Sequence, residues 1–63
     1  MNDEKHLLSD VICSRIKENY DRQQIISSYY HEYCYIEAEN QSLISILRRY
    51  DIPMQVDVAD LLS

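Results

Sequence analysis

His31 and Cys34 are the residues whose types and spacing come closest to a site for chemistry. In His31-x-x-Cys34 an imidazole and a thiol lie on adjacent turns of one helix face, where they could bind a metal or act as base and nucleophile. A zinc site needs three or four ligands, and the sequence has no CxxC or HxxxH motif to supply them. Glu32 and Glu37 are nearby carboxylates, but no pattern fixes them in place. We therefore predict no metal, no cofactor and no catalytic residue, in a protein that is not an enzyme.

Two charged pairs have simpler explanations than chemistry. Glu37 and Glu39 are two residues apart, and helix positions two apart do not face each other. Arg48-Arg49 falls in the last turn of the predicted helix, where cations interact favourably with the helix dipole. The alternative for this pair is a contact with an acidic surface. A glycine-rich phosphate loop is excluded because the chain contains no glycine.

A long helix would have to position these residues. With no glycine and a single proline, Pro53, nothing forces a turn in the first fifty or so residues. We predict one helix over about residues 3–51, ending near Tyr50–Asp51 because proline disfavours helical geometry before it. The alternative is a hinge near residues 19–24 that makes a helical hairpin.

The second half of this helix carries an apolar stripe with heptad spacing. Counted from Ile26 as position a, every a and d position up to Tyr50 is apolar or aromatic except Asn40. Such a stripe is typical of a coiled-coil seam that another helix covers. Its tyrosines suit either a binding hot spot or a core layer with solvated hydroxyls. The predicted interface residues are Ile26, Tyr29, Tyr33, Ile36, Asn40, Leu43, Leu47 and Tyr50.

The first half does not continue this register. There the a and d positions include Arg15, Asn19 and Arg22, which are poor core residues. We interpret this part as a weakened, stuttered stretch of the same helix.

Asn40 is predicted to fix the register of the assembly. In parallel two-stranded coiled coils a buried asparagine pairs with its counterpart, because any slip would leave its amide unpaired. The alternative is a half-exposed Asn40 at the end of a core layer. The flanks set Glu32 against Glu37 in a parallel homodimer and add apolar Ile44 and Ile46. We therefore favour a hetero-oligomer with a basic partner over a homodimer.

Charge and cysteine positions bear on partner and compartment. A net charge of −5 argues against nucleic acid or an anionic membrane as the main partner. No apolar run approaches the ~20 residues of a membrane span, and the N-terminus is unlike a signal or transit peptide. On one helix Cys13 and Cys34 would lie on the outer face, roughly 31 Å apart, beyond the reach of a disulfide. We predict free thiols and a cytoplasmic protein.

The stretch 39–50 resembles the C-terminal ends of axonemal coiled-coil proteins, in particular the paired subunits of the nexin–dynein regulatory complex. The shared pattern is E-N-x-x-L-x-x-x-L-x-x-Y, followed by a short break and a small apolar, acidic tail. The matching residues are Glu39, Asn40, Leu43, Leu47 and Tyr50. Members of that family are long chains, unlike this one. The resemblance implies a non-enzymatic, heteromeric filament along a ciliary microtubule.

These observations predict an all-α protein with a helical, coiled-coil segment over residues 1–52 and a short tail over 53–63. The tail would form one helical turn capped by Asp57, an extended arm through Val56 and Val58, or a frayed end. The predicted function is non-enzymatic assembly with partner helices, as a ciliary or cytoskeletal scaffold. The alternative is a small helical hairpin that dimerises into a four-helix bundle and inhibits or adapts a partner protein.

Overall fold

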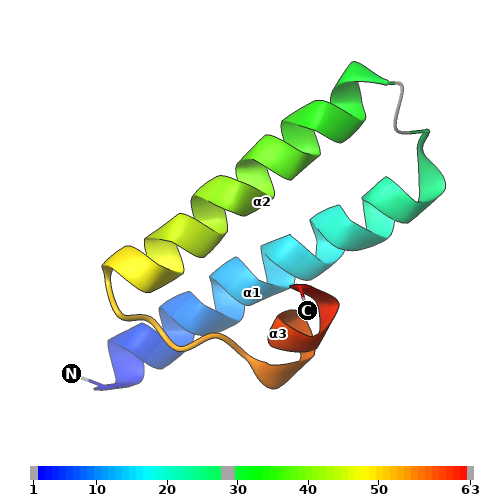
Figure 1. Cartoon of the computed structure of the whole chain (residues 1–63). Coiled ribbons are helices and arrows are strands. Elements are labelled where there is room, and N and C mark those ends of the chain that lie inside the picture. Colours follow the sequence, from blue (N-terminus) through cyan, green and yellow to red (C-terminus); the bar gives the residue numbers. More distant parts are fainter. Residues whose placement is uncertain (1, 28–29, 63) are drawn as a thin grey trace.

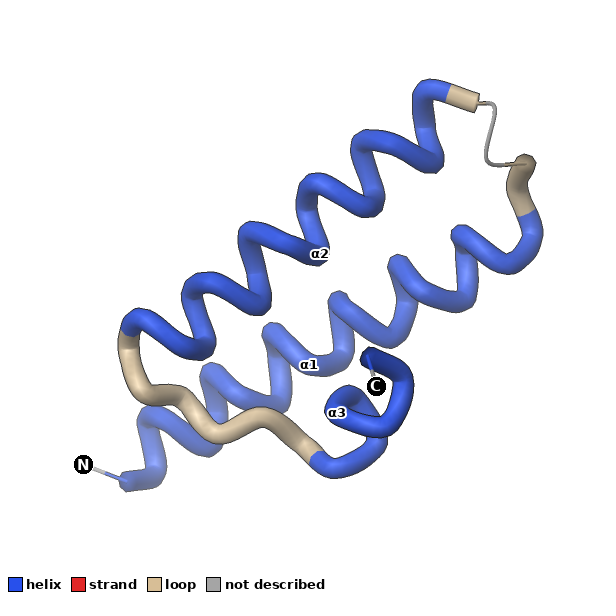
Figure 2. Tube along the Cα trace, in the orientation of Figure 1, coloured by secondary structure: helices blue, strands red, loops and turns tan. Residues whose placement is uncertain are grey.

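A computed structural model of the chain describes residues 2–27 and 30–62. It contains three helices: α1 (Asn2–Ile25), α2 (His31–Arg49) and α3 (Val56–Leu62). Helices α1 and α2 run antiparallel as a hairpin, and α3 folds back to pack on α1 (Figure 1). The described residues form helices and connecting loops without a strand, which confirms the all-α prediction (Figure 2).

The prediction of one long helix is wrong. A continuous helix over residues 3–51 would be roughly 72 Å long, whereas the molecule measures 42 Å along its longest axis. The predicted alternative of a hairpin is correct in kind but wrong in position, because residues 19–24 lie inside α1.

The turn follows α1, in a segment that lacks both glycine and proline. Residues 25–30 read Ile-Ile-Ser-Ser-Tyr-Tyr, and each of these types costs up to roughly 0.7 kcal/mol in a helix relative to alanine. At the edges of the turn, the Ile26 amide donates to the Arg22 carbonyl and the Tyr30 amide to the Ser27 carbonyl. Weak helix propensity at Ile26 and Ser27 thus permits α1 to end, and packing of α1 on α2 then stabilises the hairpin.

Helix α2 ends where Pro53 predicts, and its end has the hydrogen bonds of a Schellman motif. The Ile52 amide donates to the Leu47 carbonyl at 2.8 Å and the Asp51 amide to the Arg48 carbonyl at 3.4 Å. Asp51 takes the left-handed conformation, with φ 55°, that glycine usually supplies. Ile52 and Leu47 are both buried, which completes the apolar contact typical of this motif.

The core draws residues from all three helices and lies toward the open end of the hairpin, where α1 begins and α2 ends. Its buried members are Cys13, Ile16, Ile44, Leu47, Ile52 and Val58. The prediction that Cys13 lies on the outer face is wrong, because the chain folds back and Val58 of α3 shares a core cluster with it. A core this small supplies only modest stability in a short chain.

The tail forms a helix, so the extended arm and the frayed end are wrong for the described residues. Asp57 lies inside the first turn of α3, where its carboxylate pairs with the Lys17 ammonium at 2.8 Å. The Gln55 amide donates to the Asp10 carboxylate at 2.6 Å, and the Ser9 hydroxyl donates to the Pro53 carbonyl. These contacts tie the tail to one side of α1.

Candidate interaction surface

Asn40 has its partner within the same chain. The Asn19 side-chain amide donates to the Asn40 carbonyl oxygen at 2.9 Å, and the two residues are only 5% and 4% exposed. A slip of α2 along α1 would leave both amides unpaired in a buried position, which is costly. Asn40 therefore fixes the register of the hairpin, as the sequence predicts it to do in a coiled coil, but its partner Asn19 is not predicted from the heptad pattern.

The acidic flank of α2 is paired with the bases of α1. The Arg15 Nε lies 2.6 Å from Glu39 Oε1, and the Arg22 Nε lies 2.6 Å from Glu32 Oε1. The Asn19 amide also donates to Glu39 at 2.7 Å. The hydrogen bond from Arg15, followed by that from Asn19, holds the pKa of Glu39 below its ordinary value. These acids of α2 thus have basic partners on α1 of the same chain, and a contact with a basic partner protein stays a prediction.

Glu37 is held by amides rather than by a cation. It accepts hydrogen bonds from Gln23 at 2.9 Å and Gln41 at 3.1 Å. These bonds, with that from Gln23 the stronger cause, lower the pKa of the Glu37 carboxyl. Glu37 and Glu32 therefore each have a partner within the chain.

The predicted interface residues spread from the hairpin core to the surface. Ile36, Asn40 and Leu47 are buried between the helices, and Tyr50 is exposed. Ile26, Tyr33 and Leu43 are half-buried, and Tyr29 lies outside the described residues. Contact of any of these residues with another chain stays a prediction.

An uncovered apolar groove lies at the open end of the hairpin. Its volume is about 480 Å³, and Glu4, Lys5 and Ile52 line it together with four further residues. These four are Leu8 and Ile12 of α1, Ile46 of α2 and Tyr50, which caps the end of α2. Leu8 is 49% exposed, Ile46 38% and Tyr50 59%. We call the surface formed by these four residues the open-end face. The sequence contains a signal for it, since Leu8 and Ile12 are one turn apart, as are Ile46 and Tyr50.

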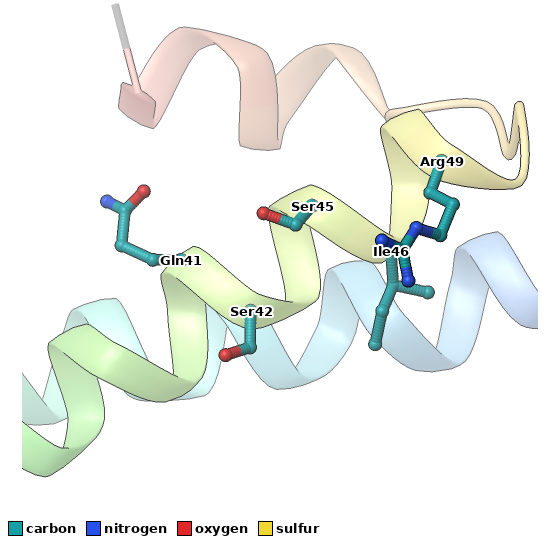
Figure 3. Close-up of a pocket in the computed structure, with 5 residues that line it drawn as sticks. All are labelled: Gln41, Ser42, Ser45, Ile46 and Arg49. Atoms are coloured by element: carbon teal, nitrogen blue, oxygen red, sulfur yellow. The ribbon is translucent and has the colours of Figure 1, made fainter.

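Ile46 also borders a shallow strip along the outside of α2. Figure 3 shows this strip, in which Ile46 points away from α3 and toward the side where α1 lies. The strip is otherwise polar, with Gln41, Ser42, Ser45 and Arg49 along it. Ile46 is therefore shared by this strip and the open-end face.

His31 and Cys34 are both exposed in the first turn of α2. In the part of the chain that the structure describes, no group of three or more His, Cys, Asp or Glu residues is placed to hold a metal ion. Cys13 and Cys34 are both free, as predicted, and the Cys13 sulfur lies 3.9 Å from the Ser9 hydroxyl.

Comparisons with known proteins find no relative for this chain. No family model, curated protein or solved structure matches it. The resemblance to axonemal coiled-coil ends stays a prediction that these comparisons do not test. None of the described helices is long and apolar enough to cross a membrane.

Proposed function

We propose that this chain is a small, non-enzymatic helical hairpin that works by assembling with protein through its open-end face. The observation that carries the proposal is the exposure of Leu8, Ile46 and Tyr50 side by side around one groove. Contiguous apolar surface of this kind on a soluble protein marks interaction sites. The number of exposed apolar side chains also supports the proposal, since more large apolar side chains of the described residues are exposed than buried.

The hairpin alternative fits the structure better than a rod-like scaffold with an unlike partner. The centre of the heptad stripe, at Ile36, Asn40 and Leu47, is buried against the chain itself. The acids that would attract a basic partner already pair with Arg15 and Arg22. What remains for a partner is apolar surface at the open end, and a hairpin that assembles there can adapt or inhibit another protein.

Site-specific photo-crosslinking in cells that produce the protein tests this proposal. A photo-reactive amino acid at position 46 should yield covalent adducts with protein, because Ile46 borders the groove. The matched control is position 25, since Ile25 is 84% exposed at the opposite end of α1. Absence of adducts from position 46, or the same adducts from both positions, would refute the proposal.

A further inference from the structure

We infer that the open-end face is covered by a second copy of this chain, with the two-fold axis along the long axis of the hairpin. In this arrangement α1 of each copy packs against α2 of the other, and both open ends lie at the same end of a four-helix bundle. The inference rests on the proposed function and deepens it by naming the partner.

The accessible surface area of the chain exceeds that expected of a compact monomer by about the area of one ordinary protein interface. The accessible area is 4927 Å², whereas a compact monomer of 7.5 kDa should expose roughly 4,250 Å². The excess is close to the roughly 800 Å² that each partner contributes to a standard protein interface. A chain of this length that buries a small core commonly gains the remaining apolar burial by oligomerisation.

The face is accessible because α3 lies on the other side of the hairpin. Asp10 and Lys17 bind the tail and are each two residues from Leu8 and Arg15, respectively. Two residues correspond to about 200° of helix rotation, so these side chains point in nearly opposite directions from α1. A second copy can therefore approach the face without displacing the tail.

Three layers with heptad spacing lie along one side of the hairpin, and the first of them belongs to the open-end face. On α1 the side chains are Leu8, Arg15 and Arg22, each seven residues from the next, and on α2 they are Ile46, Glu39 and Glu32. Leu8 and Ile46 line one groove, and the pairs Arg15–Glu39 and Arg22–Glu32 are ion pairs. Positions seven apart lie on the same side of a helix, so the six side chains form one continuous face. It is apolar at the open end and charged toward the turn.

The charge pattern selects one orientation of the two copies. In the two ion pairs that join the helices, the bases lie on α1 and the acids on α2. Glu18 of α1 lies beside Arg15 at 3.9 Å and lines the same groove as these ion pairs. A two-fold axis along the hairpin sets α1 opposite the partner's α2 at the same level, so apolar layers meet and each arginine faces a glutamate. With the opposite orientation, Leu8 and Ile46 would cover the Arg22–Glu32 layer, which buries charge against apolar surface. The face is self-complementary only in the first orientation.

The mass of the purified full chain in solution, by light scattering and sedimentation equilibrium, tests the second copy. We expect a dimer of about twice the chain mass, in which Leu8→Asp raises the dissociation constant about tenfold or more. Ile46→Asp should do the same from the other helix, and Val56→Asp, at an exposed position of α3 on the other side of the hairpin, should leave it unchanged. Circular dichroism of each variant shows that the helices are retained. A monomeric wild-type chain, or a dimer that both face variants leave intact, overturns the inference.

Paired charge variants test the orientation. R22E makes the charged layer nearest the turn wholly acidic, and E32R makes it wholly basic. Each variant alone should dimerise more weakly than the wild-type chain, whereas an equimolar mixture should prefer the mixed dimer because position 22 of each copy again faces an opposite charge at position 32 of the other. Homodimers with no preference for the mixed dimer would overturn the proposed axis, because in the opposite orientation this layer would meet Leu8 and Ile46 instead. If the wild-type chain is monomeric and adducts at position 46 contain a different protein, the second copy is excluded and the proposed function stands.

Discussion

The buried Asn19–Asn40 pair gives the sharpest test of how this hairpin chooses its register. The perturbation is a double-mutant cycle with Asn19→Leu, Asn40→Leu and the double variant, because leucine has a similar size and no hydrogen-bonding group. Asn19 donates both to Asn40 at 2.9 Å and to Glu39 at 2.7 Å. The two single changes therefore remove different numbers of hydrogen bonds.

The expected magnitudes follow from what each change leaves behind. Asn19→Leu leaves the buried Asn40 carbonyl without its donor and should cost about 1–3 kcal/mol. Asn40→Leu leaves Asn19 with Glu39 as acceptor, so it should cost less, about 0.5–1.5 kcal/mol. The double variant replaces both polar groups, and its cost should fall short of the sum of the single costs by about 1 kcal/mol. Against a total stability of ~3–5 kcal/mol for a chain of this size, these changes are large.

Urea unfolding followed by far-ultraviolet circular dichroism measures the four stabilities, at one chain concentration because association would shift them. The control cycle pairs Asn40→Leu with Ser14→Ala at an exposed position of α1. That control should be additive within about 0.5 kcal/mol. If the Asn19–Asn40 cycle is additive to the same degree, or if Asn40→Leu costs more than Asn19→Leu, the direct pair does not fix the register as argued.

Two further measurements address the end of α2 and the polar contacts between the helices. Asp51→Gly should raise the free energy of unfolding by about 0.5 kcal/mol in the same urea assay, because Asp51 has a positive φ of 55° that glycine adopts without strain. Asp51→Ala should not raise the free energy of unfolding. Lowering the pH should destabilise the fold. The pKa of Glu39 is held below its ordinary value of 4.5, so its contribution is present above that value and is lost as pH falls through the folded-state pKa. Glu39→Gln should flatten this acid-side fall, with Asp21→Asn as the control for a lost charge, and an unchanged slope would contradict the role of Glu39.

Most of the helical structure could be predicted from the sequence, but the position of the turn between α1 and α2 could not. Pro53 correctly predicts the end of α2. The single helical turn capped by Asp57, one of the predictions for the tail, is correct in kind, but α3 has seven residues and Asp57 lies inside its first turn. The turn between α1 and α2 has no such marker, because it lacks glycine and proline. Helix propensity is weak in residues 25–30, but it is equally weak at Tyr33, Cys34 and Tyr35 inside α2, so propensity does not locate the turn.

The polar contacts between α1 and α2 were harder to predict, because their residues are unfavourable at core positions when each helix is considered alone. Arg15, Asn19 and Arg22 occupy core positions of the heptad register, where each would be unfavourable alone. In the hairpin, Asn19 meets Asn40 and the two arginines meet the acids of α2. The polar residues of α1 are therefore complementary to those of α2. The heptad register of one helix does not show which positions of the two helices will face each other.

The division of this hairpin into a polar half and an apolar half has an energetic consequence. Toward the turn, the helices are joined by exposed ion pairs, which add little stability but penalise wrong pairings. Toward the open end, Cys13, Leu47 and Val58 supply the apolar burial that holds the fold together. The tail covers this core from one side only, and the open-end face leaves apolar surface on the other. Burial of that face by a second copy would therefore extend the apolar core at the end of the molecule that already contains it. Folding and association would then depend on each other.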